Sequence, residues 1–459
     1  MQKHNLNEPI IEEFIRRVRL VHAGASGKVN WDHIGDLKAD DSIAFEEIQR
    51  RESRAADVQK LVVIKLNGGL GTTMGLTAPK SIIRVKAQYN FLQIIRHQIE
   101  KLRQRAGAPI PVLFMNSFNT REATLADAGI ADINRNAPGN LPADFLQNMV
   151  PRLDRNTLLP IAGDAYNEND WCPPGHGDIY LSLYTTGILD RLLEEGYRVA
   201  FISNGDNLGA LADPHALSFF LESKLDFASE VTPKTLADLK GGVLYHSLDP
   251  EDSAGRIELL ETAQVPEEHI PDFQDTARFK YFNINNLWVN LEALRDRMRS
   301  GGLDLSLIVN PKQVNGRDVL QLETAMGAAI GHFQNTRVFI VPRTRFAPVK
   351  NCADLLVRRS DAYTLDENTF ALQMNPQRKL GEPVVKLDDA HYKKLDAFEN
   401  LMPELPSLLH AESLEVYGPV LFDTPVAIHG RVKITNSNST PLAISSLGRD
   451  ILKDEDVIL

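Results

Sequence analysis

The stretch LVVIKLNGGLGTTMG, residues 61–75, joins a short apolar run to a loop that is rich in glycine. The run over 61–66 is short and β-branched, which is typical of a buried strand rather than a helix. The glycines that follow let the backbone approach a ligand and direct several N–H groups toward an anion. Lys80 would add a positive charge for phosphate groups. The segment therefore predicts a strand that leads into a phosphate-binding loop, with a tight glycine turn that holds no ligand as the alternative.

The glycine spacing excludes two other kinds of phosphate-binding loop. Three residues separate Gly71 from Gly75, so the spacing is not the G-x-G-x-x-G of dinucleotide-binding folds. Pro79 rather than glycine precedes Lys80, so the loop is not a P-loop either. The first of these differences disfavours a dehydrogenase.

Further short apolar runs alternate with helical segments along the chain. A helix is expected over about 91–105, ending near Gly107, and strands are expected over 111–115, 199–202, 227–231 and 338–341. This alternation predicts a mostly parallel sheet that is covered on both faces. In such sheets ligands bind at the carboxyl ends of the strands. Asn67, Asn116 and Asp206 each fall just after an expected strand, which places them at that edge.

The two ends of the chain have different patterns. Residues 1 to about 55 have helical spacing, with an apolar stripe made of Ile10, Ile11, Phe14, Ile15, Val18 and Leu20. In the last 50 residues two apolar series recur every six positions, namely Leu414, Val420, Val426, Val432 and Val416, Phe422, Ile428, Ile434. Gly418 and Gly430 fall at turn positions between them. A six-residue period is typical of a β-helix, with a pair of ordinary hairpins as the alternative. The stretch is too short to stand alone, so we expect it to pack on the α/β domain or on a partner subunit.

Length and composition narrow the class of protein. A chain of 459 residues, with 43% hydrophobic and 24% charged residues, suits a globular protein of two or three domains. The net charge of −11 argues against a nucleic-acid partner. No run approaches the roughly 18 apolar residues of a membrane helix, and the first residues lack the pattern of a signal peptide. Only Cys172 and Cys352 are present, so we expect a reducing compartment, the cytoplasm, and no membrane association.

Ordered blocks over about 290 residues resemble the eukaryotic-type UDP-glucose pyrophosphorylases (UTP–glucose-1-phosphate uridylyltransferases). The first is KLNGGLGTTMG with PKS at residues 79–81. The others are MNSFNT at 115–120, PPGHGDIY at 173–180, SNGDNLG at 203–209, KGG at 240–242, AQVP at 263–266, FNINNLW at 282–288, QLETAMGAAI at 321–330 and PRTRFAPVK at 342–350. The order of so many blocks is more specific than any single motif.

The resemblance implies a fold, a reaction and its partners. The fold would be α/β: a Rossmann-like nucleotidyltransferase domain with a mixed, mostly parallel sheet at 56–385, an N-terminal helical extension at 1–55 and a C-terminal left-handed β-helix at 386–459. The reaction would transfer the uridylyl group of UTP to glucose 1-phosphate with Mg²⁺, by direct in-line attack at the α-phosphate, releasing pyrophosphate and UDP-glucose. A homo-oligomer formed through the C-terminal domain is compatible with this reading.

The resemblance also assigns roles to residues. The nucleotide-binding set is Leu66, Asn67, Gly68, Gly69, Gly71, Thr72, Met115, Gln147, Gly175, His176 and Gly177, with Gln147 at the uracil edge. The sugar-binding set is Asn204, Gly242, Glu261, Asn283 and Asn285. Asp206 would hold Mg²⁺, which needs few protein ligands. Lys350 and Lys80 would be the catalytic residues, with Lys350 facing the charge that gathers on the α-phosphate.

Alternatives remain for several of these residues and for the function as a whole. His176, Asp206 and the pair Asn283 and Asn285 of FNINN would otherwise be loop or turn residues, and Lys350 would be a solvated surface lysine. Three positions depart from the family pattern, Ala78, Gly205 and Pro233, and neither Ala78 nor Gly205 removes a functional group. A relaxed UDP-sugar pyrophosphorylase and a catalytically silent sugar-nucleotide sensor are the rival functions. The joint presence of Lys80, Asp206 and Lys350 disfavours the sensor.

Overall fold

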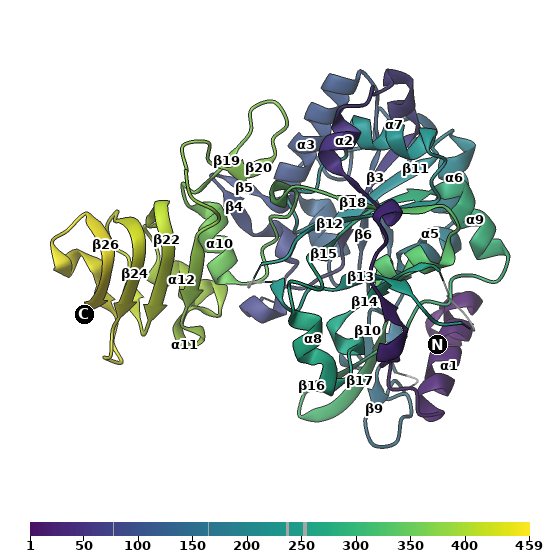
Figure 1. The fold of residues 1–459 in the computed structure, drawn as a ribbon. Coiled ribbons are helices and arrows are strands. Elements are labelled where there is room, and N and C mark those ends of the chain that lie inside the picture. Colours follow the sequence, from purple (N-terminus) through teal and green to yellow (C-terminus); the bar gives the residue numbers. More distant parts are fainter. Residues whose placement is uncertain (77, 164, 236–237, 251–254) are drawn as a thin grey trace.

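The computed structural model describes residues 1–76, 78–163, 165–235, 238–250 and 255–459 (Figure 1). Its centre is an eight-stranded sheet with the order β2-β18-β12-β15-β11-β3-β6-β7. The bounds are β2 (Ser42–Ala44), β18 (Thr336–Ile340), β12 (Phe227–Pro233), β15 (Tyr281–Asn290), β11 (Val199–Asn204), β3 (Leu61–Asn67), β6 (Val112–Asn116) and β7 (Asp144–Leu146). Strand β15 is antiparallel to both of its neighbours, and every other neighbouring pair is parallel. The predicted mixed, mostly parallel sheet is confirmed.

Side chains of β3 alternate between two hydrophobic cores, one on each face of the sheet. Leu61 and Val63 belong to the first core, whereas Val62 and Ile64 belong to the second. The first core includes residues of α2 (Phe45–Gln49), α3 (Phe91–Ala106) and α7 (Pro214–Glu222). The second includes residues of α5 (Ile179–Thr185), α6 (Ile188–Glu194) and α9 (Leu291–Arg299). The sheet is therefore buried on both faces, which explains why its strands are continuous apolar runs.

Helix α3 begins and ends where its sequence predicts. The Asn90 side chain accepts a hydrogen bond from the Gln93 amide (2.8 Å), and the Gln93 side chain accepts one from the Asn90 amide (3.1 Å). This reciprocal pair satisfies donors of the first turn. Gly107 ends the helix with a φ of 61°, a conformation that favours glycine.

Small sheets and short helices surround the centre. The strands are β1 (Ile34–Gly35) with β13 (Val243–Ser247) and β14 (Ile257–Leu260); β16 (Ile308–Val314) with β17 (Arg317–Glu323) and β9 (Leu153–Asp154); β8 (Val150–Pro151) with β10 (Trp171–Cys172); β4 (Arg84–Lys86) with β5 (Tyr89–Asn90); and β19 (Tyr363–Leu365) with β20 (Leu372–Met374). The remaining helices are α1 (Glu8–His22), α4 (Arg121–Ala126), α8 (Ile270–Gln274), α10 (Cys352–Arg359), α11 (Asp389–Tyr392) and α12 (Leu395–Leu401).

The N-terminal segment is only partly the helical extension that was expected. Helix α1 buries Ile10, Phe14, Arg17 and Val21, which recur at helical spacing, whereas Ile15 and Leu20 of the predicted stripe are exposed. After α1 the chain supplies two short strands: β1 pairs with β13, and β2 forms the edge of the central sheet. The helical prediction over 1–55 is therefore wrong for these strands. Their pairing partners lie about 200 to 300 residues away, so local spacing carries no sign of them.

The C-terminal residues form parallel strands rather than hairpins. Strands β21 (Val384–Leu387), β22 (Ser407–Tyr417), β24 (Ala427–Thr435) and β26 (Ile451–Ile458) make one parallel sheet, and β23 (Val420–Leu421) pairs with β25 (Leu442–Ala443), also in parallel. Leu414 lies opposite Val432, and Val416 opposite Ile434, so each partner is eighteen residues further along the chain. The eight residues of the two six-residue series are all buried in the same core that contains α3 and α10. The segment packs on the α/β domain, as expected (Figure 1).

Candidate active site

A cavity of about 340 Å³ lies at the carboxyl ends of β3, β6 and β11. Of the residues that the sequence predicts for the site, Leu66, Asn67, Gly68, Gly69, Lys80, Met115, Gln147, Gly175, His176, Asn204 and Asp206 line it. Parallel strands whose carboxyl ends meet at one edge bring these residues together from distant parts of the chain. The cavity is therefore the candidate binding site for the nucleotide.

At one end of the cavity the Gln147 carboxamide is held in a fixed orientation. Its Nε2 donates to the Gly175 carbonyl (2.8 Å), and its backbone N–H donates to the Asn116 carbonyl (2.7 Å). A Cβ atom at Gly68 would lie 2.6 Å from the Gln147 Oε1 atom, so only glycine leaves room for this carboxamide. An immobilised amide with a donor and an acceptor suits recognition of a base edge.

His176 is a neutral hydrogen-bond donor at the cavity wall. Its Nδ1 atom accepts from the Met326 amide (2.9 Å), so the ring proton lies on Nε2. Burial lowers the pKa of His176 to about 4, and the ring stays uncharged at neutral pH. Gly175 has a φ of 83°, and a Cβ atom there would lie 2.5 Å from the Thr324 carbonyl oxygen. Gly177 donates its N–H to that same oxygen (2.8 Å), so the two glycines pack the loop against Thr324.

Buried polar groups hold the end of β3. The Asn67 Nδ2 atom donates to Asn116 Oδ1 (2.8 Å) and to Thr124 Oγ1 (2.7 Å). Asn116 in turn donates to Asp144 (3.1 Å), which Arg121 pairs with at 2.9 Å. These bonds satisfy polar groups that would otherwise be costly to bury. They also fix the starting point of the glycine-rich loop.

Lys80 joins the two sides of the cavity. Its Nζ atom donates to Asp206 Oδ2 (2.5 Å), after β11, and to the Val349 carbonyl (2.7 Å), directly before Lys350. Both side chains of the Lys80–Asp206 pair keep some solvent exposure. An ammonium group has three donors, so Lys80 retains one for a phosphate oxygen. The contact brings together the predicted metal-binding carboxylate and the segment that carries Lys350.

The remaining predicted sugar residues form a second cluster. The Asn283 amide donates to the Gly242 carbonyl (2.7 Å), and Asn283 Nδ2 donates to Asn285 Oδ1 (3.0 Å). A Cβ atom at Gly242 would lie 2.8 Å from the Glu261 carboxylate. Burial raises the pKa of Glu261, and the positive charge of Lys350 opposes that shift. Lys350 is exposed, and its effect on Glu261 shows that its charge reaches this cluster of predicted sugar-binding residues, called the sugar cluster below.

The structure does not bring every predicted residue to the cavity wall. Within the described chain, Gly71, Thr72, Gly177, Gly242, Glu261, Asn283, Asn285 and Lys350 lie outside the lining. A Cβ atom at Gly71 would collide with Leu76, so that glycine shapes the loop itself. Thr72 is exposed in the short helical turn after it.

Sequence reasoning attached no role to five lining residues, Leu70, Ser81, Pro173, Gln321 and Glu323. Burial raises the pKa of Glu323, to which Asn310 donates at 3.2 Å. Gln321 and Glu323 lie two apart on β17 and so share one face of that strand. The polar–apolar–polar order of Gln321, Leu322 and Glu323 would have indicated that both polar side chains lie on one face of a strand.

The donor set fits a magnesium ion that takes few ligands from the protein. No group of three or more His, Cys, Asp or Glu side chains suited to a metal occurs in the residues that the structure describes. The cavity lining holds two carboxylates, Asp206 and Glu323. Asp206 alone would be enough to hold the ion, because Mg²⁺ completes its octahedron with water and phosphate oxygens. Among the described residues, no helix is long and apolar enough to cross a membrane.

Comparisons with known proteins agree over nearly the whole chain. The sequence profile of a family described as UTP–glucose-1-phosphate uridylyltransferase matches residues 11–429. The UTP–glucose-1-phosphate uridylyltransferase of Solanum tuberosum is 38% identical over 454 residues, which cover 97% of this chain and 93% of the relative. That of Saccharomyces cerevisiae is 39% identical over 430 residues, or 93% of this chain and 84% of the relative.

Solved structures give the same result. A variant of UDP-glucose pyrophosphorylase from Leishmania major in complex with UDP-glucose superposes with a TM-score of 0.90 at 37% identity, covering 100% of this chain and 98% of that one. UDP-glucose phosphorylase from Trypanosoma brucei gives a TM-score of 0.88 at 39% identity, with the same coverage. The mixed α/β fold with a large, mostly parallel sheet is thus shared with these proteins.

Proposed function

The chain belongs to the UTP–glucose-1-phosphate uridylyltransferase family, and from that premise we propose how its residues join UTP to glucose 1-phosphate. The reaction is transfer of the uridylyl group to the sugar phosphate, which gives UDP-glucose and pyrophosphate. The observation that carries the residue roles is the single cavity in which the glycine-rich loop, Gln147, His176 and Asp206 converge.

The nucleotide lies along that cavity. Gln147 reads the uracil edge, because its carboxamide is already oriented by the Gly175 carbonyl. The backbone N–H groups of the loop around Gly68 and Gly69 and the Nε2–H group of His176 hold the ribose and phosphates. Lys80 gives its remaining N–H donor to a phosphate oxygen.

Asp206 would hold Mg²⁺, which supplies positive charge to the phosphate oxygens when it is bound. Lys80 orients this carboxylate through the 2.5 Å contact to Oδ2. The protein's share of the metal site is therefore a single carboxylate that is placed in advance.

The sugar phosphate binds between the cavity and the second cluster. Asn204, Gly242, Glu261, Asn283 and Asn285 offer amide, carbonyl and carboxylate groups that can bridge neighbouring sugar hydroxyls. A phosphate oxygen of glucose 1-phosphate attacks the α-phosphorus in line, the bond to the β-phosphate oxygen breaks, and pyrophosphate leaves. Lys350 stabilises the negative charge that gathers at the α-phosphate. Positioning and electrostatics suffice for such a transfer, so no covalent nucleophile is needed.

A coupled assay of pyrophosphate release tests this function. We expect turnover with UTP and glucose 1-phosphate that stops in EDTA and is much slower with ATP, CTP or dTTP. Comparable turnover in EDTA, or equal use of ATP, would refute the metal or nucleotide assignment. Galactose 1-phosphate and xylose 1-phosphate in the same assay separate a strict enzyme from a relaxed UDP-sugar pyrophosphorylase.

We also propose that residues 386–459 form a left-handed β-helix that mediates self-association. The eighteen-residue offset between parallel strands corresponds to three six-residue sides per coil, which supports this architecture. Division of the chain at residues 56 and 386 is part of the same proposal and can be tested by limited proteolysis. We place the protein in the cytoplasm, because its two cysteines are unpaired and buried, which suits a reducing compartment.

A further inference from the structure

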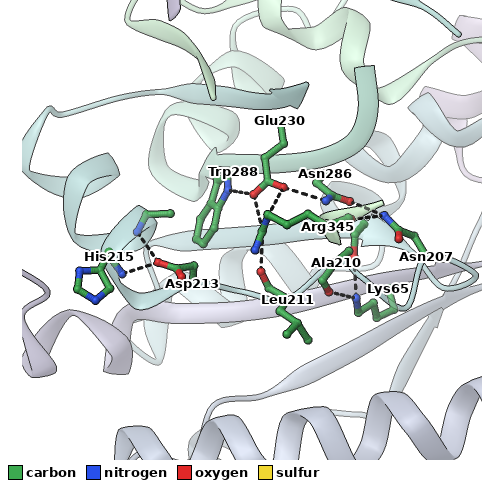
Figure 2. Close-up of polar contacts among 12 residues, drawn as sticks. Lys65, Asn207, Ala210, Leu211, Asp213, His215, Glu230, Asn286, Trp288 and Arg345 are labelled. Atoms are coloured by element: carbon green, nitrogen blue, oxygen red, sulfur yellow. Dashed lines mark hydrogen bonds and ion pairs between the residues drawn. The ribbon is translucent and has the colours of Figure 1, made fainter. Parts of the chain in front are cut away.

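A fully buried carboxylate, that of Glu230 on β12, lies next to the candidate active site without lining it. It accepts four hydrogen bonds: two from Arg345, through Nε (2.9 Å) and Nη2 (2.6 Å), one from Asn286 Nδ2 (2.9 Å) and one from Trp288 Nε1 (3.1 Å) (Figure 2). Glu230 is 0% exposed and Arg345 is 7% exposed. Desolvation of two charges offsets much of their attraction, so such a pair contributes little net stability compared with apolar side chains of similar size.

Glu230 fixes an irregularity in β15. The pairing of β12 with β15 runs from Glu230 opposite Asn286 directly to Val231 opposite Asn283, so Ile284 and Asn285 have no partner on β12. Asn285 has a φ of 56°, in the left-handed region. Such bulges re-aim side chains beside active sites. The bond from Asn286 to Glu230 holds the bulge that directs Asn283 and Asn285 into the sugar cluster.

Asn207 ties the loop after β11 to the same network. Its Nδ2 atom donates to Asn286 Oδ1 (3.3 Å) and to the Arg345 carbonyl (3.1 Å) (Figure 2). Its Oδ1 atom accepts from the Ala347 amide (2.9 Å). Asn207 directly follows Asp206, the proposed magnesium ligand. The loop that carries Asp206 is therefore bonded both to β15 and to the segment before Lys350.

The segment before Lys350 is held at alternate residues. Arg345 is anchored by its side chain on Glu230 and by its carbonyl on Asn207, and Ala347 is anchored by its amide on Asn207. Further on, the Val349 carbonyl accepts from Lys80. Lys350 follows immediately, so its backbone position is set by these bonds.

We propose that Glu230, Arg345, Asn286 and Asn207 form one positioning network that sets Asp206, Asn285 and Lys350 at their working separations. The proposal rests on the function given above. Arg345 is then a positioning residue and not a catalytic cation, because its guanidinium is committed to Glu230 and to the Leu211 carbonyl (2.7 Å). The network is hydrogen-bonded to the segments that carry Asn285, Asp206 and Lys350, whereas Gln147 is held separately by the Gly175 carbonyl.

Two variants test the network. Arg345→Lys keeps the positive charge but loses the planar guanidinium that donates two hydrogen bonds to Glu230, and Glu230→Gln/Arg345→Met removes both charges together. The double variant is expected to fold because it removes both partners of this buried ion pair and leaves neither of them behind. Arg378→Met is the matched control. Arg378 is also 7% exposed, but it donates to the carbonyls of Gly381, Leu408 and Ala411, away from the cavity lining.

Three quantities are measured on each folded variant: kcat, the melting temperature, and the affinities for UDP and UDP-glucose by calorimetry. We expect kcat to fall by about 10- to 100-fold in both network variants, the scale of a small misplacement. UDP-glucose should bind only about as tightly as UDP, while UDP affinity stays within twofold of the wild type. Arg378→Met should lower the melting temperature and leave kcat unchanged.

The opposite pattern would overturn the proposal. If the network variants lose only thermal stability, with kcat and the UDP-glucose to UDP affinity ratio within twofold of the wild type, the network is merely structural. The proposed function is judged separately by wild-type turnover. If the wild type is inactive, the calorimetric ratio still tests the positioning of the sugar cluster.

Discussion

Removal of the Lys350 ammonium group should slow the chemical step and leave the fold intact. The side chain is exposed, and its charge acts on Glu261 within the sugar cluster rather than on a core partner. The segment that carries it is held through Ala347 and Val349 and does not depend on the side chain. Lys350→Ala should therefore lower kcat by on the order of 10²–10³, the loss for one preorganised group that faces the transition state. This corresponds to roughly 2.7–4 kcal/mol of transition-state stabilisation. Lys350→Arg should restore only part of it, because a planar fork does not replace a compact ammonium group.

A double-mutant cycle with Lys80 makes this prediction sharper. Lys80 donates to Asp206 and to the carbonyl that precedes Lys350, so Lys80→Ala releases both. Hydrogen bonds to charged groups contribute about 1.5–3 kcal/mol, and the partial exposure of this pair places the loss near the lower value. Lys80→Ala should lower kcat and also raise KM for UTP. Because Lys80 helps to hold Lys350 in place, the double variant should lose about tenfold less than the product of the two single losses.

The assay is steady-state kinetics in both directions, on variants whose circular dichroism and melting temperature match those of the wild type. A Lys350→Ala enzyme with near-normal kcat would refute the assignment of the catalytic cation. Losses that multiply without coupling would refute the link through the Val349 carbonyl. In the first case Lys80 is the next candidate, since Arg345 is paired with Glu230 and Arg343 is paired with Asp238.

Three further predictions follow from particular contacts. Gly68→Ala places a methyl group against the Gln147 carboxamide, so KM for UTP should rise about tenfold. In a Gln147→Ala background the same change should raise KM little further, and an equal rise there would show that the effect does not act through Gln147. Burial lowers the pKa of Lys65 to about 7, so between about pH 7 and pH 10.5 the unfolded chain binds more protons than the folded one, and the free energy of unfolding should rise with pH. In urea titrations Lys65→Met should flatten this rise, whereas a difference from the wild type that does not depend on pH would refute the reasoning. Ile451 and Ile458 are 52% and 81% exposed on the edge strand β26. If the C-terminal strands mediate self-association, Ile458→Lys should lower the molecular mass measured by sedimentation velocity, and a wild type that is monomeric at high concentration would contradict that role.

Elements that depend on local pattern could be predicted from the sequence. The apolar run at 61–66 is a strand because both faces of the sheet are covered. The six-residue series at Leu414 and Val416 is buried because parallel strands place its members side by side in one core. Asn67 and Asp206 reach one cavity because parallel strands end at a common edge. These features follow from periodicity and from chain direction, which a sequence contains.

Features that depend on distant partners could not be predicted in the same way. Ile15 has helical spacing but is exposed, because Arg17 and Val21 occupy the buried face of α1 instead. The edge strand Ser42–Ala44 is paired with a strand some 300 residues later, and nothing in its own three residues indicates that contact. The sugar cluster depends on a bulge at Asn285 that is set from β12, again by a residue far away in the sequence.

The cations of the site show why charge alone does not assign a role. By charge alone, each of Lys80, Arg345 and Lys350 would attract a phosphate. In the fold, the buried carboxylate of Glu230 accepts hydrogen bonds from two nitrogens of the Arg345 guanidinium. This pairing neutralises much of the positive charge, so Arg345 attracts a developing negative charge only weakly. The Lys80 ammonium group is divided between Asp206 and a carbonyl, which suits a residue that holds the ground state and the metal ligand. Lys350 is exposed and, among the residues that the structure describes, forms no ion pair, so its charge is the one least neutralised by the protein. The interaction of such a cation with the substrate strengthens most when negative charge grows on the α-phosphate. The partner of each side chain, rather than the residue type, therefore distinguishes the binding role of Lys80, the positioning role of Arg345 and the catalytic role of Lys350.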